Sequence, residues 1–115
     1  MALAVQVKTI DPQGLLDSIY EEIDEGNIAT WSYDDDGDFS HVTPDGQWEG
    51  EAWLHPTVEV NTLLLTVIPP RLGAVTAEAY AVYHGRFIEM LLAHFDTSFS
   101  EAVATARPAF GDAVE

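Results

Sequence analysis

The sequence contains no cysteine among its 115 residues. Disulfide bonds, thiolate metal ligands and thiol nucleophiles are therefore excluded together. Small secreted domains usually carry disulfides, so this absence favours a cytoplasmic location. The first residues lack a basic stretch followed by a long apolar one, and we expect no export signal. The longest apolar run, residues 63–67, is interrupted by Thr66 and is far shorter than the roughly 20 residues of a membrane-spanning helix.

Basic residues are almost as scarce. Twenty acidic residues face four basic ones, giving a formal net charge of -16, and the four are Lys8, Arg71, Arg86 and Arg107. Residues 9–70 contain no lysine or arginine at all. Such a chain repels phosphate backbones and anionic lipids, so we expect neither nucleic-acid nor membrane binding. A basic protein surface is the partner that this charge would attract.

The patterning predicts one α+β domain over residues 1–115, with residues 1–10 as an arm or short strand and 109–115 frayed. Asp11 and Pro12 begin a helix with apolar residues at helical spacing, and Gly26 ends it. Period-two patterning then predicts strands over residues 28–34, 38–43, 47–55 and 58–68. A long helix over 76–95 follows, and then a short one that opens at Ser98 with Glu101 three residues on as a capping box. The expected fold is an antiparallel β-meander of three to four strands flanked by an N-terminal helix and one long plus one short C-terminal helix.

The turn over residues 34–38 allows a test of strand register. A three-residue loop with Gly37 left-handed places Tyr33 opposite Phe39 and Trp31 opposite His41. That register gathers the four rings on one face of the sheet, so it is the one we predict.

The acidic residues suggest a function for this region. Four of them crowd the end of the first helix, where the helix dipole disfavours negative charge. An exposed tryptophan beside carboxylates is typical of a binding hot spot. We therefore expect a non-catalytic protein that holds a basic protein through Glu21, Glu22, Asp24, Glu25, Asp34, Asp35, Asp36, Asp38 and Trp48. In size and charge alone, the chain resembles bacterial immunity proteins and antitoxins, which cap basic nucleases, and type III secretion chaperones, which are small acidic homodimers.

Metal and cofactor chemistry find little support. Asp34, Asp36 and Asp38 alternate as in a calcium loop, but Gly37 falls fourth and Asp45 twelfth, where an EF-hand needs glycine sixth and glutamate twelfth. No phosphate-binding glycine loop or nucleophile elbow is present. We expect no metal and no cofactor.

A second interpretation is a small ligand-binding domain or enzyme. Its site would combine a cation for a ligand carboxylate with histidines and the aromatic sheet face, that is, Trp31, His41, His84 and Arg86. Gly85 lies inside the long helix, where it would permit close approach of another backbone. We therefore also expect a homodimer through residues 76–95.

Overall fold

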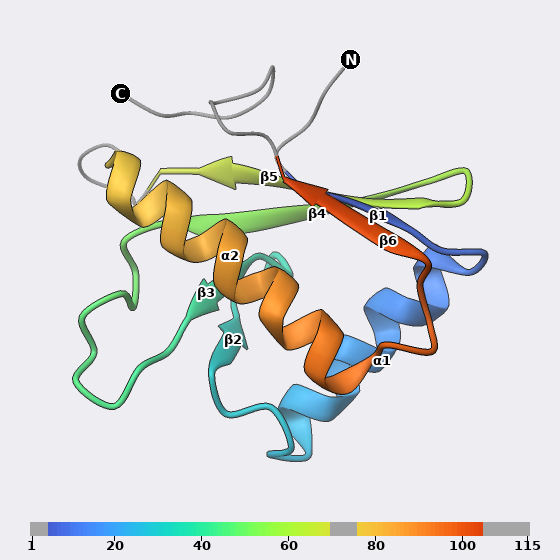
Figure 1. Cartoon of the computed structure of the whole chain (residues 1–115). Helices are drawn as coiled ribbons and strands as arrows, with labels where there is room; N and C mark the ends of the chain where they lie inside the picture. The colour runs from blue at the N-terminus through green and yellow to red at the C-terminus, as the bar shows by residue number, and fades with distance from the viewer. Residues whose placement is uncertain (1–4, 70–75, 105–115) are drawn as a thin grey trace.

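The computed structural model of the protein describes residues 5–69 and 76–104. These residues form two helices and a six-stranded antiparallel sheet with the strand order β2-β3-β4-β5-β1-β6 (Figure 1). The elements in chain order are β1 (Val5–Lys8), α1 (Pro12–Asp24), β2 (Trp31–Tyr33), β3 (Phe39–His41), β4 (Trp53–Glu59), β5 (Thr62–Ile68), α2 (Ala77–His94) and β6 (Glu101–Ala104). The predicted α+β class is confirmed, but the predicted sheet of three to four strands is wrong, because β1 and β6 extend the meander of β2 to β5 to six strands. Residues 1–4 of the predicted arm and the tail at 109–115 lie outside the described residues.

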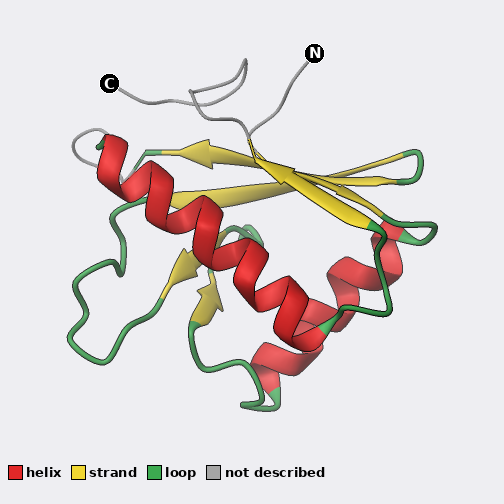
Figure 2. Cartoon of the chain, viewed as in Figure 1, coloured by secondary structure: helices red, strands yellow, loops and turns green. Residues whose placement is uncertain are grey.

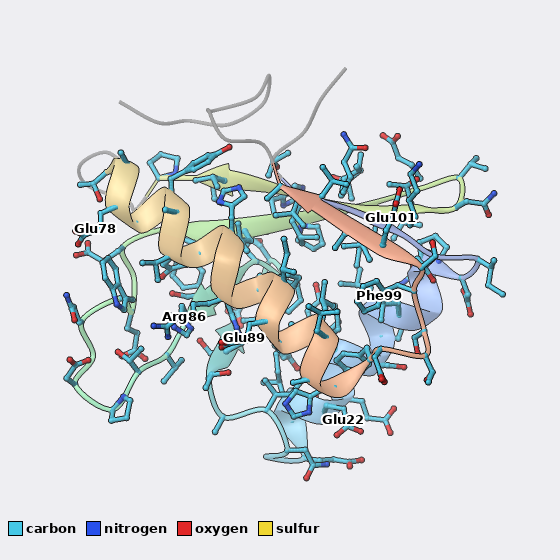
Figure 3. The ribbon with its side chains drawn as sticks, viewed as in Figure 1. Glu22, Glu78, Arg86, Glu89, Phe99 and Glu101 are labelled. Carbon is cyan, nitrogen blue, oxygen red and sulfur yellow. The ribbon has the colours of Figure 1, made fainter. Side chains whose placement is uncertain are left out.

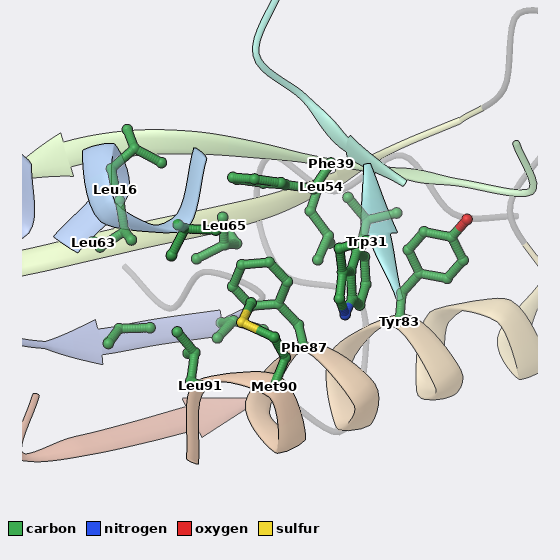
Figure 4. Close-up of a cluster of buried hydrophobic side chains, with 14 of the residues drawn as sticks. Leu16, Trp31, Phe39, Leu54, Leu63, Leu65, Tyr83, Phe87, Met90 and Leu91 are labelled. Carbon is green, nitrogen blue, oxygen red and sulfur yellow. The ribbon is translucent and has the colours of Figure 1, made fainter. Parts of the chain in front are cut away.

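Both helices cover the same face of the sheet (Figure 2). Antiparallel pairing sets Val5 opposite Leu65 and Val7 opposite Leu63, so alternate residues of these strands point toward the helices. They join one buried cluster with Ile19 of α1 and other helix residues, part of which Figure 4 shows. Full burial of each such side chain contributes about 1.5–3 kcal/mol. Apolar burial between the sheet and the two helices therefore holds the fold together.

Both helices begin with a side-chain cap, and the start and stop of α1 are the predicted ones. Asp11 caps α1 by accepting a hydrogen bond from the Gly14 amide at 3.0 Å, and Pro12 occupies the first turn. Gly26 follows the helix with a φ of 81°. Thr76 caps α2 through the Ala79 amide at 3.0 Å. Both long helices are therefore confirmed with nearly the predicted limits.

The central strands differ from the prediction at their limits. Residues 47–50 form turns, so β4 begins only at Trp53. Pro56 does not break the strand but lies inside β4, paired with Leu65. On its other side β4 pairs with β3 only at Leu54, so the missing amide of Pro56 costs no ladder hydrogen bond there. The reversal occurs instead at residues 60–61, where Asn61 takes a positive φ of 54°.

The prediction of a short third helix from Ser98 is wrong. Residues 101–104 form β6, which pairs with β1 and places Ala102 opposite Val7. The preceding residues are held by hydrogen bonds from the Thr9 hydroxyl to the Ser98 carbonyl at 2.7 Å and from the Ser100 amide to the Lys8 carbonyl at 2.8 Å. A free edge of β1 thus outweighs the local helix preference of this short segment.

The hairpin of β2 and β3 has the predicted register. Tyr33 pairs with Phe39 and Trp31 with His41, which places the four rings on one face. Gly37 has a φ of 83°, and the Asp34 amide donates to the Asp38 carbonyl across the turn. A three-residue loop with a left-handed glycine is therefore confirmed.

Candidate acidic binding surface

Two tyrosines of different elements join the end of α1 to the β2–β3 turn. Tyr20 of α1 donates its hydroxyl to the Gly37 carbonyl at 2.7 Å, and Tyr33 of β2 donates to Asp24 Oδ1 at 2.6 Å. The two rings also pack together, with centroids 4.6 Å apart. The acidic residues at 21–25 and those at 34–36 are therefore neighbours in space. We call the exposed or half-exposed carboxylates of these two segments the acidic surface: Glu21, Glu22, Asp24, Glu25, Asp34, Asp35 and Asp36.

Within the turn, two carboxylates serve the local structure. Asp34 Oδ1 accepts hydrogen bonds from the amides of Asp36 and Asp38, both at 3.0 Å. The Asp38 side chain is buried, with the residue 5% exposed, and its Oδ1 lies 2.7 Å from His55 Nδ1 of β4. Asp38 therefore anchors the turn to the sheet, whereas Asp35 and Asp36 are free to face a partner.

No lysine or arginine within residues 5–69 and 76–104 forms an ion pair with the acidic surface. Among residues 5–69 and 76–104, the ion pairs are Lys8 with Glu101 at 3.3 Å and His55 with Asp38. Arg86 projects from α2 (Figure 3), and Arg71 and Arg107 lie outside the described residues. The acidic surface therefore carries a negative charge that no lysine or arginine of the described residues neutralises through an ion pair.

This charge acts on the two tyrosines that hold the surface together. Burial, followed by the nearby Asp38 carboxylate, raises the pKa of Tyr20 to about 12. The hydrogen bond to Asp24 raises the pKa of Tyr33. Both hydroxyls therefore keep their protons, and both hydrogen bonds persist, throughout the physiological pH range.

Three carboxylates of the turn come close enough to be considered as metal ligands. One oxygen each from Asp34, Asp36 and Asp38 lies within 4.8 Å of the others. Calcium prefers six to eight oxygen ligands, and exposed acidic groups of this kind are common without an ion. Asp38 is also already engaged by His55. We assign no metal site to the turn.

Trp48 lies apart from the acidic surface. It belongs to the connection between β3 and β4, its side chain is half-buried against the core, and its carbonyl accepts a hydrogen bond from the Tyr83 hydroxyl. The Ser40 hydroxyl forms a hydrogen bond of 3.1 Å with the Tyr83 hydroxyl and accepts another of 3.0 Å from the Gly50 amide. Trp48 thus fastens the connection to α2, and the structure does not bring it together with the acidic residues.

The four residues of the alternative ligand site are only partly assembled. Trp31 and His41 pack ring to ring with centroids 4.8 Å apart, but both are buried. His84 is buried against Tyr80 on α2, and Arg86 is exposed. Two grooves of about 380 and 330 Å³ lie elsewhere and share Thr9, Ile10, Thr97 and Ser98, and none of the four residues lines either groove. Within the described part of the chain, the burial of Trp31, His41 and His84 argues against a site that these four residues share.

The helix that we expect to mediate a homodimer, α2, buries most of its apolar side chains in the core of its own subunit. Tyr80, Tyr83, Phe87 and Leu91 are buried, whereas Leu92 is 58% exposed. A Cβ added at Gly85 would meet no atom within 4 Å, so that glycine faces open space. Self-association through residues 76–95 stays a prediction, which sedimentation of the purified protein would check.

The sequence reasoning missed Tyr20 and Tyr33 as connectors and counted them only as apolar or sheet residues. Their signal is weak: each is a tyrosine within an apolar pattern that also has acidic residues beside it. A phenylalanine would fill the same space at either position. The choice of tyrosine therefore indicates that the hydroxyl has a hydrogen-bond partner at the edge of the core.

Comparisons with models of protein families, with curated proteins and with solved structures found no match. No helix in residues 5–69 or 76–104 is long and apolar enough to cross a membrane.

Proposed function

We propose that this protein is a non-catalytic binding protein that holds a basic protein partner through the acidic surface. The observation that carries the proposal is the pair of hydrogen bonds from Tyr20 and Tyr33, which merge two acidic segments separated in sequence. Preformed carboxylates in one place attract a basic surface more strongly than the same charges scattered over the molecule.

Electrostatic self-repulsion supports this reading. Clustering carboxylates without a cation destabilises a folded protein, and at the end of α1 the helix dipole adds to the cost. The basic residues in the last turn that would relieve it are absent from α1. A basic partner would supply the missing positive charge and would stabilise the folded state on binding.

A synthetic decalysine peptide is the probe for the first test, with binding measured by fluorescence anisotropy at low salt. Neutralising four exposed carboxylates through Glu21→Gln, Glu25→Gln, Asp35→Asn and Asp36→Asn is expected to weaken binding by about tenfold or more. The side chains of these four residues accept no hydrogen bond from residues 5–69 or 76–104, so we expect the fold to persist.

The matched control neutralises four exposed carboxylates elsewhere: Glu49→Gln, Glu51→Gln, Glu59→Gln and Glu78→Gln. Both variants lose the same net charge, so any general effect of charge is equal in the two. We expect the control to weaken binding by less than about threefold. Equal losses in the two variants would show that the peptide reads net charge alone, and the proposal would fail.

A further inference from the structure

His41 is a buried histidine with one ring nitrogen left without a partner. The residue is 2% exposed, and Nε2 has no hydrogen-bond partner among the described residues. Its Nδ1 lies 2.8 Å from the Thr30 carbonyl, an oxygen that can only accept. The proton of the neutral ring must therefore sit on Nδ1, and Nε2 carries a lone pair inside the protein.

The surroundings of the ring disfavour a second proton. The centroid of the His41 ring lies 4.8 Å from that of Trp31 in β2 and 6.1 Å from that of Tyr83 in α2. Two charged groups of α2 also act on the ring, Arg86 against the charged form and Glu89 in its favour. Burial is the largest influence and lowers the pKa of His41 below its ordinary value of 6.5, and it outweighs the hydrogen bond to the Thr30 carbonyl, which acts in the opposite direction. The folded protein therefore holds this histidine neutral.

The hairpin that His41 belongs to is weakly tied to the rest of the sheet. β2 is an edge strand, and β3 pairs with β4 only at Phe39 and Leu54. The hairpin is also attached by the contact of Asp38 with His55, by the two tyrosine hydrogen bonds to α1, and by side-chain packing against α2. Figure 4 shows this packing for Trp31 and Phe39 against Tyr83 of α2. A charge forced into that packing would act on the hairpin before it acted on the longer strands.

The same hairpin carries three of the seven residues of the acidic surface, namely Asp34, Asp35 and Asp36. The turn of residues 34–38 follows β2 directly, and the hydrogen bonds of Tyr20 and Tyr33 join this part of the hairpin to α1. Displacing β2 and β3 would separate the turn from the carboxylates at the end of α1.

We propose that His41 is a pH-sensitive latch: the neutral ring holds the β2–β3 hairpin against α2, and protonation of Nε2 in mild acid releases the hairpin and takes the acidic surface apart. The claim that the latch regulates binding of a basic partner rests on the proposed function. The claim that the hairpin opens in acid does not depend on that function. The direction of the effect follows from linkage. In the open hairpin the ring has its ordinary pKa, so it takes up a proton below about pH 6.5, while the closed form resists it.

The experiment measures amide hydrogen exchange of the whole protein at pH 7.5 and pH 5.5, corrected for the intrinsic rate. One proton taken up on opening should raise the opening constant of residues 31–41 by up to about tenfold over this interval. Amides of β1 and β5 should change much less. The variant His41→Phe keeps the ring volume without a titrating group, and the Thr30 carbonyl still accepts from the Val42 amide at 2.8 Å. We expect less than about a twofold change in this variant.

His94→Phe is the matched control, since His94 is an exposed histidine of the same helix that packs on the hairpin. It should retain the wild-type response. An equal acid response in His41→Phe, a rise spread evenly over β1 and β5, or no rise in the wild type would each overturn the latch. If His41→Phe does not fold, nuclear magnetic resonance titration of the wild-type His41 ring decides instead. A midpoint below pH 6.5 supports the latch, and one at or above it refutes the latch.

Decalysine binding at the same two pH values separates the two proposals. Weaker binding at pH 5.5 in the wild type, but not in His41→Phe, would link the latch to the acidic surface. If decalysine fails to bind even at pH 7.5, the proposed function fails, and hydrogen exchange still decides whether the latch exists.

Discussion

The sheet contains two hairpins that are built on different principles. β4 and β5 pair over seven residues each, and β5 lies between β4 and β1. β2 and β3 pair over three residues each at the edge, and side chains of α1 and α2 hold them in place. The first hairpin depends on backbone pairing and apolar burial, which change little with pH or salt. The position of the second hairpin depends on packed aromatic rings, on tyrosine hydroxyls and on the histidine His41. This hairpin also carries the carboxylates of Asp34, Asp35 and Asp36.

The largest expected effect comes from removing the ring that ties the second hairpin to α2. Phe87 is fully buried and lies 5.1 Å from Trp31 and 5.4 Å from Phe39 between ring centroids. Phe87→Ala should lower the free energy of unfolding by about 3–5 kcal/mol in urea denaturation. Leu92→Ala on the exposed face of the same helix should cost less than about 0.5 kcal/mol. Similar losses in the two variants would contradict the assigned packing.

A smaller effect is expected at the turn of the second hairpin. Gly37 has a positive φ, and a Cβ there would lie 2.7 Å from the Tyr20 hydroxyl. Gly37→Ala should therefore cost about 1 kcal/mol for the backbone and about 1 kcal/mol more for the disturbed hydrogen bond. Gly46 shares the positive φ but has open space around it, so Gly46→Ala should cost only the first part. Equal losses in thermal unfolding would mean that the Tyr20 contact contributes nothing.

The smallest effect concerns the Tyr20 hydroxyl itself. Tyr20→Phe should cost about 0.5–1.5 kcal/mol at neutral pH. The wild type should also lose stability above pH 10, because the unfolded tyrosine ionises there while the folded one resists until about pH 12. Urea denaturation between neutral and alkaline pH should show a shallower loss in Tyr20→Phe. Parallel curves for the two proteins would indicate that the folded hydroxyl is not protected.

The two hairpins also differ in how far the sequence predicts them. Gly37 and the ring pattern of the second hairpin were enough to predict its register, because only one alignment gathers Trp31, Tyr33, Phe39 and His41 on one face. The first hairpin misled the prediction at Pro56, since the sequence does not reveal that β3 stops short of it. β6 was mistaken for a helix for the same reason: its conformation comes from the free edge of β1, which is a tertiary property.

For the candidate site, the sequence predicted which residues are acidic but not which of them meet. Composition placed the carboxylates in two segments, and only the structure shows that Tyr20 and Tyr33 join these segments. It also shows that Asp38 is buried and that Trp48 packs elsewhere, two facts that depend on contacts distant in sequence.

The most direct test of the account is the salt dependence of decalysine binding to the wild type and to the double variant Tyr20→Phe with Tyr33→Phe. Between roughly 0.01 and 0.1 M salt the Debye length shortens from about 30 Å to about 10 Å, so attraction to a joined acidic surface should weaken strongly. We predict a steep loss of affinity with salt in the wild type. In the double variant, where the two acidic segments are no longer fastened together, we predict weaker binding at low salt and a shallower loss. Affinity that does not change with salt, or identical curves for the two proteins, would contradict the claim that the tyrosines assemble one binding surface.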